Sequence, residues 1–143
     1  MKMLAIDYGD ARTGLATCDE TELLATPLMP QIEEKSMNRV AALICERARE
    51  AGAKRLVLGL PRNMDGTEGA RAKKSYKLKA LLEAGSGLPV VLWDERRTTV
   101  SAAAILSENA TFGKKRKERL DSVSAAVILE SYLAYRKNHP EEA

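Results

Sequence analysis

The sequence predicts an α/β fold in which a mixed five-stranded sheet carries helices on both faces. Near the amino terminus, apolar runs alternate with turn-forming residues, as in an antiparallel meander of three strands. Two later apolar runs have the composition of buried parallel strands, and helical patterns surround them. A length of 143 residues suits one domain. We assign residues 1–137 to that domain and residues 138–143 to a polar carboxyl-terminal tail.

The predicted meander consists of three short strands. Residues 3–6 are an apolar run, residues 7–14 are rich in turn-forming types, and residues 15–18 resume an extended pattern. This order predicts a hairpin with an unusually polar tip. Residues 23–29 form the third predicted strand, which we expect to end at the nearby prolines, Pro27 and Pro30.

Helices and parallel strands are predicted for the rest of the chain. Ser36 is a plausible N-cap for a helix in which Val40, Ile44 and Ala48 recur at helical spacing, and Gly52 has the position of a C-cap. The further predicted elements are a strand at 55–58, a loop at 59–69, a basic helix at 70–84, a strand at 89–93, a helix from Thr98 or Thr99 to Leu106, a basic connection at 109–119 and a final helix at 120–135.

Composition excludes several kinds of site and leaves the partner open. The formal net charge of +3 is too small to identify a nucleic-acid partner by itself. With one Phe and one Trp, few rings are available to stack on bases. Cys18 and Cys45 predict neither a disulfide framework nor a zinc site, and two free thiols suit a reducing cytosol. The single histidine, His139, lies in the tail, which argues against a Ser-His-Asp or Cys-His site.

The chain is expected to remain in the cytoplasm. The apolar run at the amino terminus is interrupted by Asp7 before it reaches the length of a signal-peptide core. No apolar run approaches the roughly 20 residues that span a bilayer.

Three carboxylates are the candidates for chemistry. Asp7 directly follows an apolar strand, Glu95 follows the strand that ends at Trp93, and Asp121 opens the last predicted helix. Each also has a purely structural explanation: Asp7 as a turn residue, Glu95 as a surface ion pair with an arginine that follows it, and Asp121 as a helix cap. Spacing alone does not decide between these alternatives.

Taken together, the three acids fit a magnesium site. Carboxylate oxygens on separate elements are suitable ligands for Mg²⁺, which keeps several waters and is completed by substrate phosphates. Mn²⁺ is the expected substitute. Two such ions about 4 Å apart activate water and stabilise the leaving oxygen in phosphodiester cleavage. This chemistry predicts a metal-dependent nuclease that needs no histidine.

A basic run precedes Asp121 and contains Lys114, Lys115, Arg116 and Lys117. Most charge runs are only solvated surface. Beside a metal site, the run is expected to hold a nucleic-acid backbone through phosphate contacts. A second group of basic residues extends along the helix that follows Gly69: Arg71, Lys73, Lys74, Lys77 and Lys79.

Four motifs resemble those of the YqgF family, the RuvX-type relatives of Holliday junction resolvases. They occur in the family's order between about residues 3 and 135. The first combines Ile6-Asp7-Tyr8-Gly9 with Arg12-Thr13-Gly14-Leu15-Ala16; the second, Gly59-Leu60-Pro61 with Asp65-Gly66-Thr67 and Gly69; the third, Asp94-Glu95-Arg96 with Thr98-Thr99; and the fourth, Leu120-Asp121-Ser122 with Ala125-Ala126 and Ile128-Leu129.

The resemblance implies a ribonuclease-H-like fold with Asp7, Glu95 and Asp121 as catalytic, metal-binding acids, and we add Arg12 to the expected nucleic-acid contacts. It further implies a role in processing the 5′ end of the small-subunit ribosomal RNA precursor. The alternatives are resolution of branched DNA at Holliday junctions and recognition of nucleic acid without cleavage. The chain is expected to be a monomer or a homodimer; two-site cleavage of a four-way junction would require the dimer.

Overall fold

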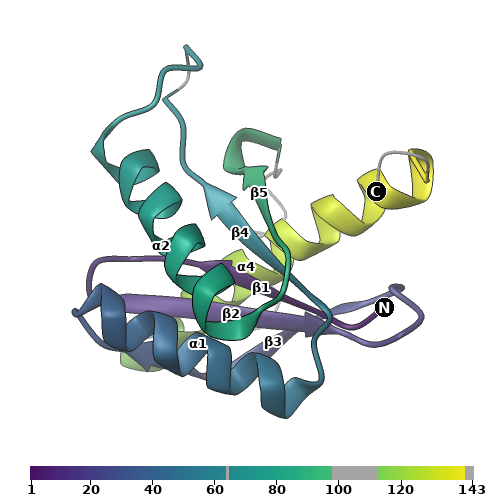
Figure 1. Cartoon of the computed structure of the whole chain (residues 1–143), viewed down its shortest axis with the longest axis horizontal. Helices are drawn as coiled ribbons and strands as arrows, with labels where there is room; N and C mark the ends of the chain where they lie inside the picture. The colour runs from purple at the N-terminus through teal and green to yellow at the C-terminus, as the bar shows by residue number, and fades with distance from the viewer. Residues whose placement is uncertain (64, 98–112, 141–143) are drawn as a thin grey trace.

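The computed structural model describes residues 1–63, 65–97 and 113–140, with the backbone alone for residues 113–121. Figure 1 shows the elements along the chain. They are β1 (Met3–Asp7), β2 (Arg12–Cys18), β3 (Ala25–Glu33), α1 (Met37–Ala51), β4 (Arg55–Leu60), α2 (Ala70–Ser86), β5 (Val90–Asp94), a 3-10 turn (Glu95–Arg97) and α4 (Gly113–Asn138).

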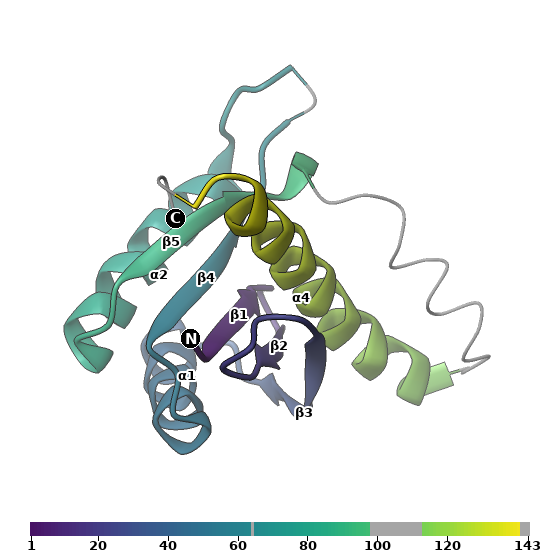
Figure 2. The same cartoon turned by 90° about the vertical axis from the view of Figure 1, so that its right-hand side faces the viewer.

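The predicted mixed sheet is confirmed. Its five strands lie in the order β3-β2-β1-β4-β5. β2 pairs antiparallel with both β1 and β3, whereas β4 pairs parallel with both β1 and β5. Helices α1 and α2 cover one face and α4 covers the other, as Figure 2 shows. The three-strand meander followed by two parallel strands is therefore the observed topology.

Strand alternation divides the apolar residues between two cores. Leu4 and Ile6 of β1 join the core under α1 and α2. Met3 and Ala5, the alternate residues, join the core under α4. Because side chains of a strand alternate between faces, Asp7 is directed to the α4 face of the sheet. That face therefore carries the first of the predicted acids.

The first hairpin is tighter than the sequence pattern indicated. The segment that we expected to be turn up to Gly14 already belongs to β2 from Arg12 onward. Gly14 pairs with Asp7, and Arg12 pairs with Glu33 of β3. Backbone pairing on both sides outweighs the local turn preference of these residues. Arg12 is consequently part of the sheet and half-buried.

The prediction that the third strand ends at its prolines is wrong. β3 runs from Ala25 to Glu33, through both Pro27 and Pro30. It is an edge strand, so a residue without a backbone N–H is tolerated where it faces away from β2. The pairing shifts register between Thr13 and Leu15 of β2, which accommodates the irregularity.

Helix α1 forms with the predicted caps. The Ser36 hydroxyl accepts a hydrogen bond from the Arg39 amide at 3.5 Å. Gly52 adopts the left-handed conformation, with φ of 68°, and its amide donates to the carbonyls of the last turn. The expected Val40, Ile44 and Ala48 are all buried. Local sequence signals and tertiary packing agree over this helix.

The remaining boundaries move by a few residues. β4 extends to Leu60, because Gly59 and Leu60 pair with β5, so the predicted loop begins only at Pro61. Helix α2 ends at Ser86 rather than Ala84, and β5 covers Val90–Asp94 rather than 89–93. Both cysteines are free and buried, in agreement with the sequence. The predicted helix from Thr98 or Thr99 to Leu106 lies outside the described residues.

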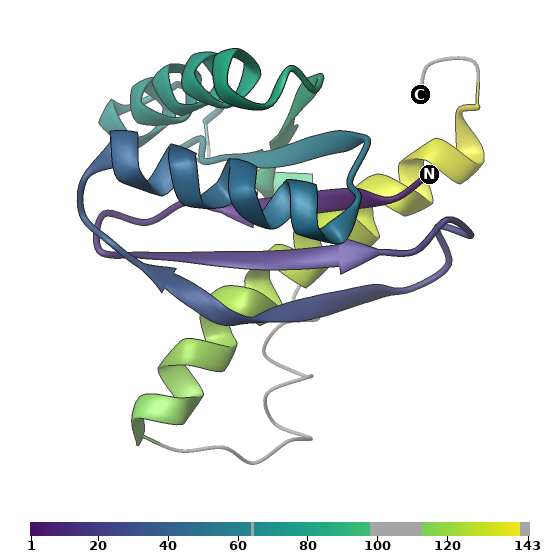
Figure 3. The same ribbon diagram turned by 60° about the horizontal axis from the view of Figure 1, so that its bottom comes forward.

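The last helix begins earlier than predicted. α4 starts at Gly113, so residues 113–119, which we expected to be a connection, belong to it. Lys, Arg and Glu are good helix formers, and neither Gly nor Pro interrupts the segment after its first residue. Figure 3 shows the amino-terminal turns of α4 extending past β3, beyond the sheet. None of the helices in the described part of the chain is long and apolar enough to cross a membrane.

Candidate active site

Two of the three predicted acids lie at one edge of the sheet. The parallel strands β1, β4 and β5 all end there. Asp7 is the last residue of β1, and Glu95 is the first residue after β5, at the start of the 3-10 turn. Both side chains are half-buried. The carboxyl ends of parallel strands are where open α/β sheets usually place ligands.

Gly59 gives the Glu95 side chain its space. A Cβ atom at Gly59 would lie 2.8 Å from Glu95 Oε1 and 2.8 Å from Ile128 Cδ1 of α4. Real Cβ atoms do not approach other atoms so closely, so any other residue at this position would displace both neighbouring side chains. The Glu95 carboxylate therefore lies directly over the backbone of β4.

Asp7 is at the level of Gly59 on the neighbouring strand. Ile6, the residue before Asp7, pairs with Leu58 of β4, the residue before Gly59. Adjacent strands are about 4.8 Å apart. Asp7 and the Glu95 carboxylate above Gly59 therefore share one face of the sheet, the face that α4 covers.

A serine of α4 holds both ends of the segment that carries Glu95. The Ser131 hydroxyl accepts a hydrogen bond from Trp93 Nε1 at 3.1 Å and donates one to the Arg97 carbonyl at 3.2 Å. The Arg97 guanidinium also lies over the Trp93 ring, 4.7 Å from its centroid. Glu95 is midway between the two residues that Ser131 contacts, so this hydrogen-bond pair fixes its turn against the helix.

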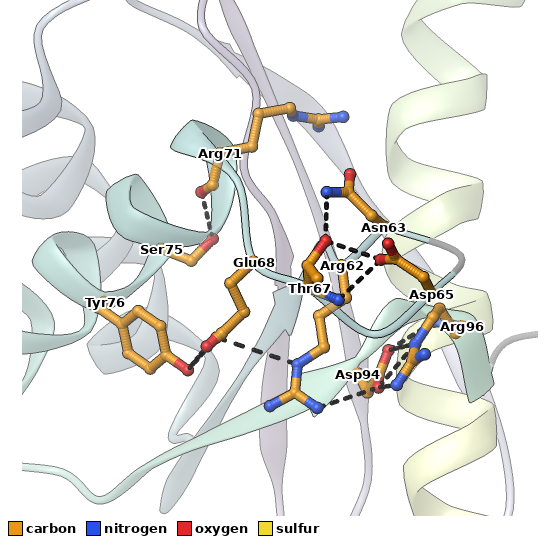
Figure 4. A network of polar contacts seen from close by, with 10 residues as sticks. All are labelled: Arg62, Asn63, Asp65, Thr67, Glu68, Arg71, Ser75, Tyr76, Asp94 and Arg96. Carbon is orange, nitrogen blue, oxygen red and sulfur yellow. Dashed lines mark hydrogen bonds and ion pairs between the residues drawn. The ribbon is translucent and has the colours of Figure 1, made fainter.

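Asp94 faces the opposite side of β5 and anchors a polar network, which Figure 4 shows. Arg96 donates two hydrogen bonds to Asp94 Oδ2, from Nε at 3.1 Å and from Nη2 at 2.7 Å. Arg62 Nη1 lies 3.6 Å from the same oxygen. The hydrogen bonds from Arg96 hold the pKa of Asp94 below its usual range, against the opposing effect of burial. Arg96 therefore pairs with Asp94.

The loop after β4 is organised by hydrogen bonds among its own residues. The Asp65 carboxylate accepts hydrogen bonds from the amide and the hydroxyl of Thr67, at 3.0 and 2.7 Å. Asn63 Nδ2 donates to the Thr67 hydroxyl at 2.8 Å. These bonds lower the pKa of Asp65. The second sequence motif, which includes Asp65 and Thr67, thus forms a loop that is held by internal hydrogen bonds.

Asp121 and the basic run are placed only through their backbone. Asp121 lies two helical turns before Ile128, on the same side of α4, about 10 Å along the axis. Lys114, Lys115, Arg116 and Lys117 occupy the first turns of the helix. Their side chains, like that of Asp121, lie outside the described residues. Among the described side chains, which do not include that of Asp121, no three His, Cys, Asp or Glu residues form a metal-binding group.

The basic residues of α2 lie close to the first hairpin. Arg71, Lys73, Lys74 and Lys77 are exposed. Lys74 Nζ forms an ion pair with Asp10 at 2.7 Å, which lowers the pKa of Asp10 and raises that of Lys74. This pair links the start of α2 to the hairpin tip that follows Asp7.

Sequence reasoning missed the residues that position Glu95. Gly59 and Ser131 contact Glu95 or its turn, although neither is near it in the chain. A glycine at the end of a buried strand is a signal of close approach, and it could have identified Gly59. No local pattern distinguishes Ser131 from other helical serines.

A protein-family model described as "RuvX: Holliday junction resolvase" matches residues 1–135. Three similar relatives carry the name "Putative pre-16S rRNA nuclease". That of Syntrophus aciditrophicus is 39% identical, with 93% of this chain and 88% of the relative covered. That of Symbiobacterium thermophilum is 38% identical, with 100% of this chain and 99% of the relative covered. That of Listeria monocytogenes is 40% identical, with 93% of this chain and 97% of the relative covered.

Two solved structures share the fold. The chain superposes on Thermus thermophilus RuvC with a TM-score of 0.58 and 13% identity, covering 94% of this chain and 96% of that one. For RuvC from the same organism in complex with a Holliday junction substrate, the TM-score is 0.62 and the identity 16%, with the same coverage. At this level of identity the likeness concerns architecture, and it confirms the predicted ribonuclease-H-like fold.

Proposed function

The chain belongs to the RuvX family, and from this we propose that it is a divalent-metal-dependent nuclease that processes the 5′ end of the small-subunit ribosomal RNA precursor. As a member of that family it is a hydrolase of phosphodiester bonds. The observation that carries the proposed site is the Glu95 carboxylate over Gly59, at the level of Asp7. One carboxylate ends β1, the other directly follows β5, and both face the same side at one sheet edge.

This donor set suits a hard cation. Asp7 and Glu95 supply only oxygen atoms, the ligands that Mg²⁺ and Mn²⁺ prefer. Gly59 leaves the space that the Glu95 carboxylate needs to remain at that edge. We propose that Asp7, Glu95 and Asp121 hold the metal. When bound, the metal would activate water and stabilise the leaving oxygen of the cut phosphodiester.

The protein residues would orient the site around that cation. Asp7 is fixed by its pairing with Gly14, and Glu95 by the turn that Ser131 holds at both ends. Arg12 and the basic run, Lys114, Lys115, Arg116 and Lys117, are the proposed phosphate contacts. Such contacts position a polyanion without reading its sequence.

The names of the relatives point to precursor RNA as the substrate, and branched DNA is the second candidate. Three relatives at 38–40% identity are named for the 16S rRNA precursor. The family description names the Holliday junction instead. A nuclease of ribosomal RNA would act in the cytoplasm, where bacterial precursors are made, and we infer that location.

A substrate comparison tests this proposal. Cleavage of a precursor RNA fragment, a linear DNA duplex and a four-way DNA junction would be followed at identical Mg²⁺ and salt concentrations. We expect the RNA to be cut at its 5′ processing site and the linear duplex to remain intact. Symmetric cutting of the junction alone, by a chain whose solution mass is that of a dimer, would establish the junction resolvase instead.

A further inference from the structure

We propose that a single-stranded RNA segment binds in a groove along the outer edge of β5; the inference rests on the proposed nuclease function. The groove has a volume of about 560 Å³. It is lined by arginines and tyrosines from four parts of the chain, and we call it the edge groove: Arg55, Arg62, Tyr76, Arg97, Tyr132 and Tyr135.

The edge groove reaches the candidate active site. β5 is the last strand of the sheet, so one of its sides pairs with β4 and the other faces the groove. Asp94 lines the groove, and Glu95 is the next residue in the chain. A strand lying in the groove would therefore continue toward the edge where Asp7 and Glu95 lie.

The charge of the edge groove favours a polyanion. Three guanidinium groups line it, against one carboxylate, that of Asp94. Arg62 lies between two acids but at a distance: its Nη1 is 3.6 Å from Asp94 Oδ2 and its Nε is 4.0 Å from Glu68 Oε2. Both separations exceed a hydrogen bond, so the guanidinium keeps donors for a phosphate.

The edge groove has planar side chains on which bases can stack. Tyr76 is 42% exposed, and its hydroxyl donates to the Glu68 carboxylate at 2.5 and 3.0 Å (Figure 4), which fixes the ring. On the other side of the groove, the Arg97 guanidinium lies 4.7 Å from the Trp93 centroid and 5.2 Å from that of Tyr135. Bases stack on aromatic rings and on guanidinium planes of this kind.

Single-stranded RNA is the occupant that matches both the positive charge and the planar side chains of the edge groove. Phosphates suit the arginines, and unpaired bases expose the faces that stacking needs, whereas the bases of a duplex do not. A peptide strand could also add to the free edge of β5. It would gain its backbone hydrogen bonds there but would bring no phosphates to the three guanidinium groups.

Binding of a labelled oligouridylate about eight nucleotides long tests the proposal, with the full chain and no divalent metal, so that cleavage does not contribute. Tyr76→Ala should weaken binding about 5- to 150-fold, the range for loss of one stacked base. Tyr76→Phe keeps the stacking ring but loses the hydrogen bond to Glu68, so it should bind more tightly than Tyr76→Ala and no more tightly than the wild type. Arg97→Gln, which acts from the opposite side of the groove, should also weaken binding. Arg39→Gln, on the exposed surface of α1, is the matched control for loss of an arginine.

A paired RNA of the same length separates stacking from general charge attraction. Tyr76→Ala should leave the binding of that duplex unchanged. Equal oligouridylate affinity for wild type, Tyr76→Ala and Arg97→Gln would overturn the proposal and leave the edge of β5 as a site for a peptide strand. Because the assay needs no metal, its failure is distinct from failure of the nuclease proposal, in which the wild type would bind RNA but cut nothing with Mg²⁺.

Discussion

Asp94 and Glu95 are adjacent in the chain, but the structure gives them opposite surroundings. Asp94 faces the loop after β4, where it accepts hydrogen bonds from Arg96 and lies near Arg62. Glu95 faces α4, where it lies over Gly59 and beside Ile128. Strand alternation at the end of β5 therefore separates a carboxylate that stabilises the fold from one that is directed to the candidate site.

The comparison shows how one sheet edge combines stability with chemistry. A carboxylate held by two arginines is a poor metal ligand, since its charge is already compensated. The Glu95 carboxylate is instead placed by its contact with Gly59 and by a turn whose two ends are hydrogen-bonded to Ser131.

Asp7→Asn should lower cleavage by about 10³-fold or more, because the amide keeps the shape but loses the charge that the proposed metal needs. The free energy of unfolding should stay the same or rise, since repulsion among clustered acids is relieved. Single-turnover cleavage and urea denaturation measure the two effects. Undiminished cleavage by the pure variant would remove Asp7 from the site.

Gly59→Ala should lower cleavage by about 10²-fold, because the added methyl displaces the Glu95 carboxylate. We also expect a stability loss of about 1–3 kcal/mol from overpacking against Ile128. The double variant Gly59→Ala/Ile128→Val removes the clashing Cδ1 and should recover stability. Cleavage should remain low in it, because the conflict with Glu95 persists; recovery of both would mean that only packing had been disturbed.

Ser131→Ala should lower cleavage about 10-fold and stability by about 1 kcal/mol, because the turn of Glu95 loses its attachment to α4. Ser86→Ala is the matched control. The Ser86 hydroxyl also makes two hydrogen bonds, to the Leu82 carbonyl at 2.7 Å and from the Leu88 amide at 3.1 Å, at the end of α2. If both variants lost stability equally and neither lost cleavage, Ser131 would be purely structural.

Asp94→Asn should reduce stability at neutral pH by about 1–2 kcal/mol. The folded-state pKa of Asp94 lies below its usual value of 3.8. Its contribution is therefore present above that value and lost as the pH falls through the lowered pKa. Urea denaturation from neutral to acid pH should show the gap between wild type and variant closing below about pH 4. A gap that did not change with pH would assign the effect to packing.

Much of the fold could be predicted from the sequence, because buried strands and capped helices carry local signals. Helix α1 is an example, with its Ser36 and Gly52 caps. β3 was predicted too short, because an edge strand tolerates prolines that a central strand does not. The start of α4 was predicted too late. The charged residues at 113–119 suggested a connecting loop, but Lys, Arg and Glu are good helix formers and the segment is helical.

The candidate site could be predicted only in part. Asp7 and Glu95 follow apolar strands, and that local feature identified them. Their relation depends on strand order, and the support for Glu95 comes from far along the chain: Ser131 is 38 residues from Trp93 and 34 from Arg97. The edge groove also escaped prediction. The scarcity of Phe and Trp suggested few stacking platforms, but tyrosines and arginines from distant segments gather at β5.

The most direct test compares Glu95→Gln with Asp94→Asn in single-turnover cleavage of the precursor RNA, together with their urea midpoints. We expect Glu95→Gln to lose cleavage by about 10³-fold while its urea midpoint stays at or above that of the wild type. We expect Asp94→Asn to lose stability and to retain cleavage within about 10-fold. Wild-type cleavage by Glu95→Gln, or loss of stability by Glu95→Gln in place of Asp94→Asn, would contradict the division of roles between these two neighbouring acids.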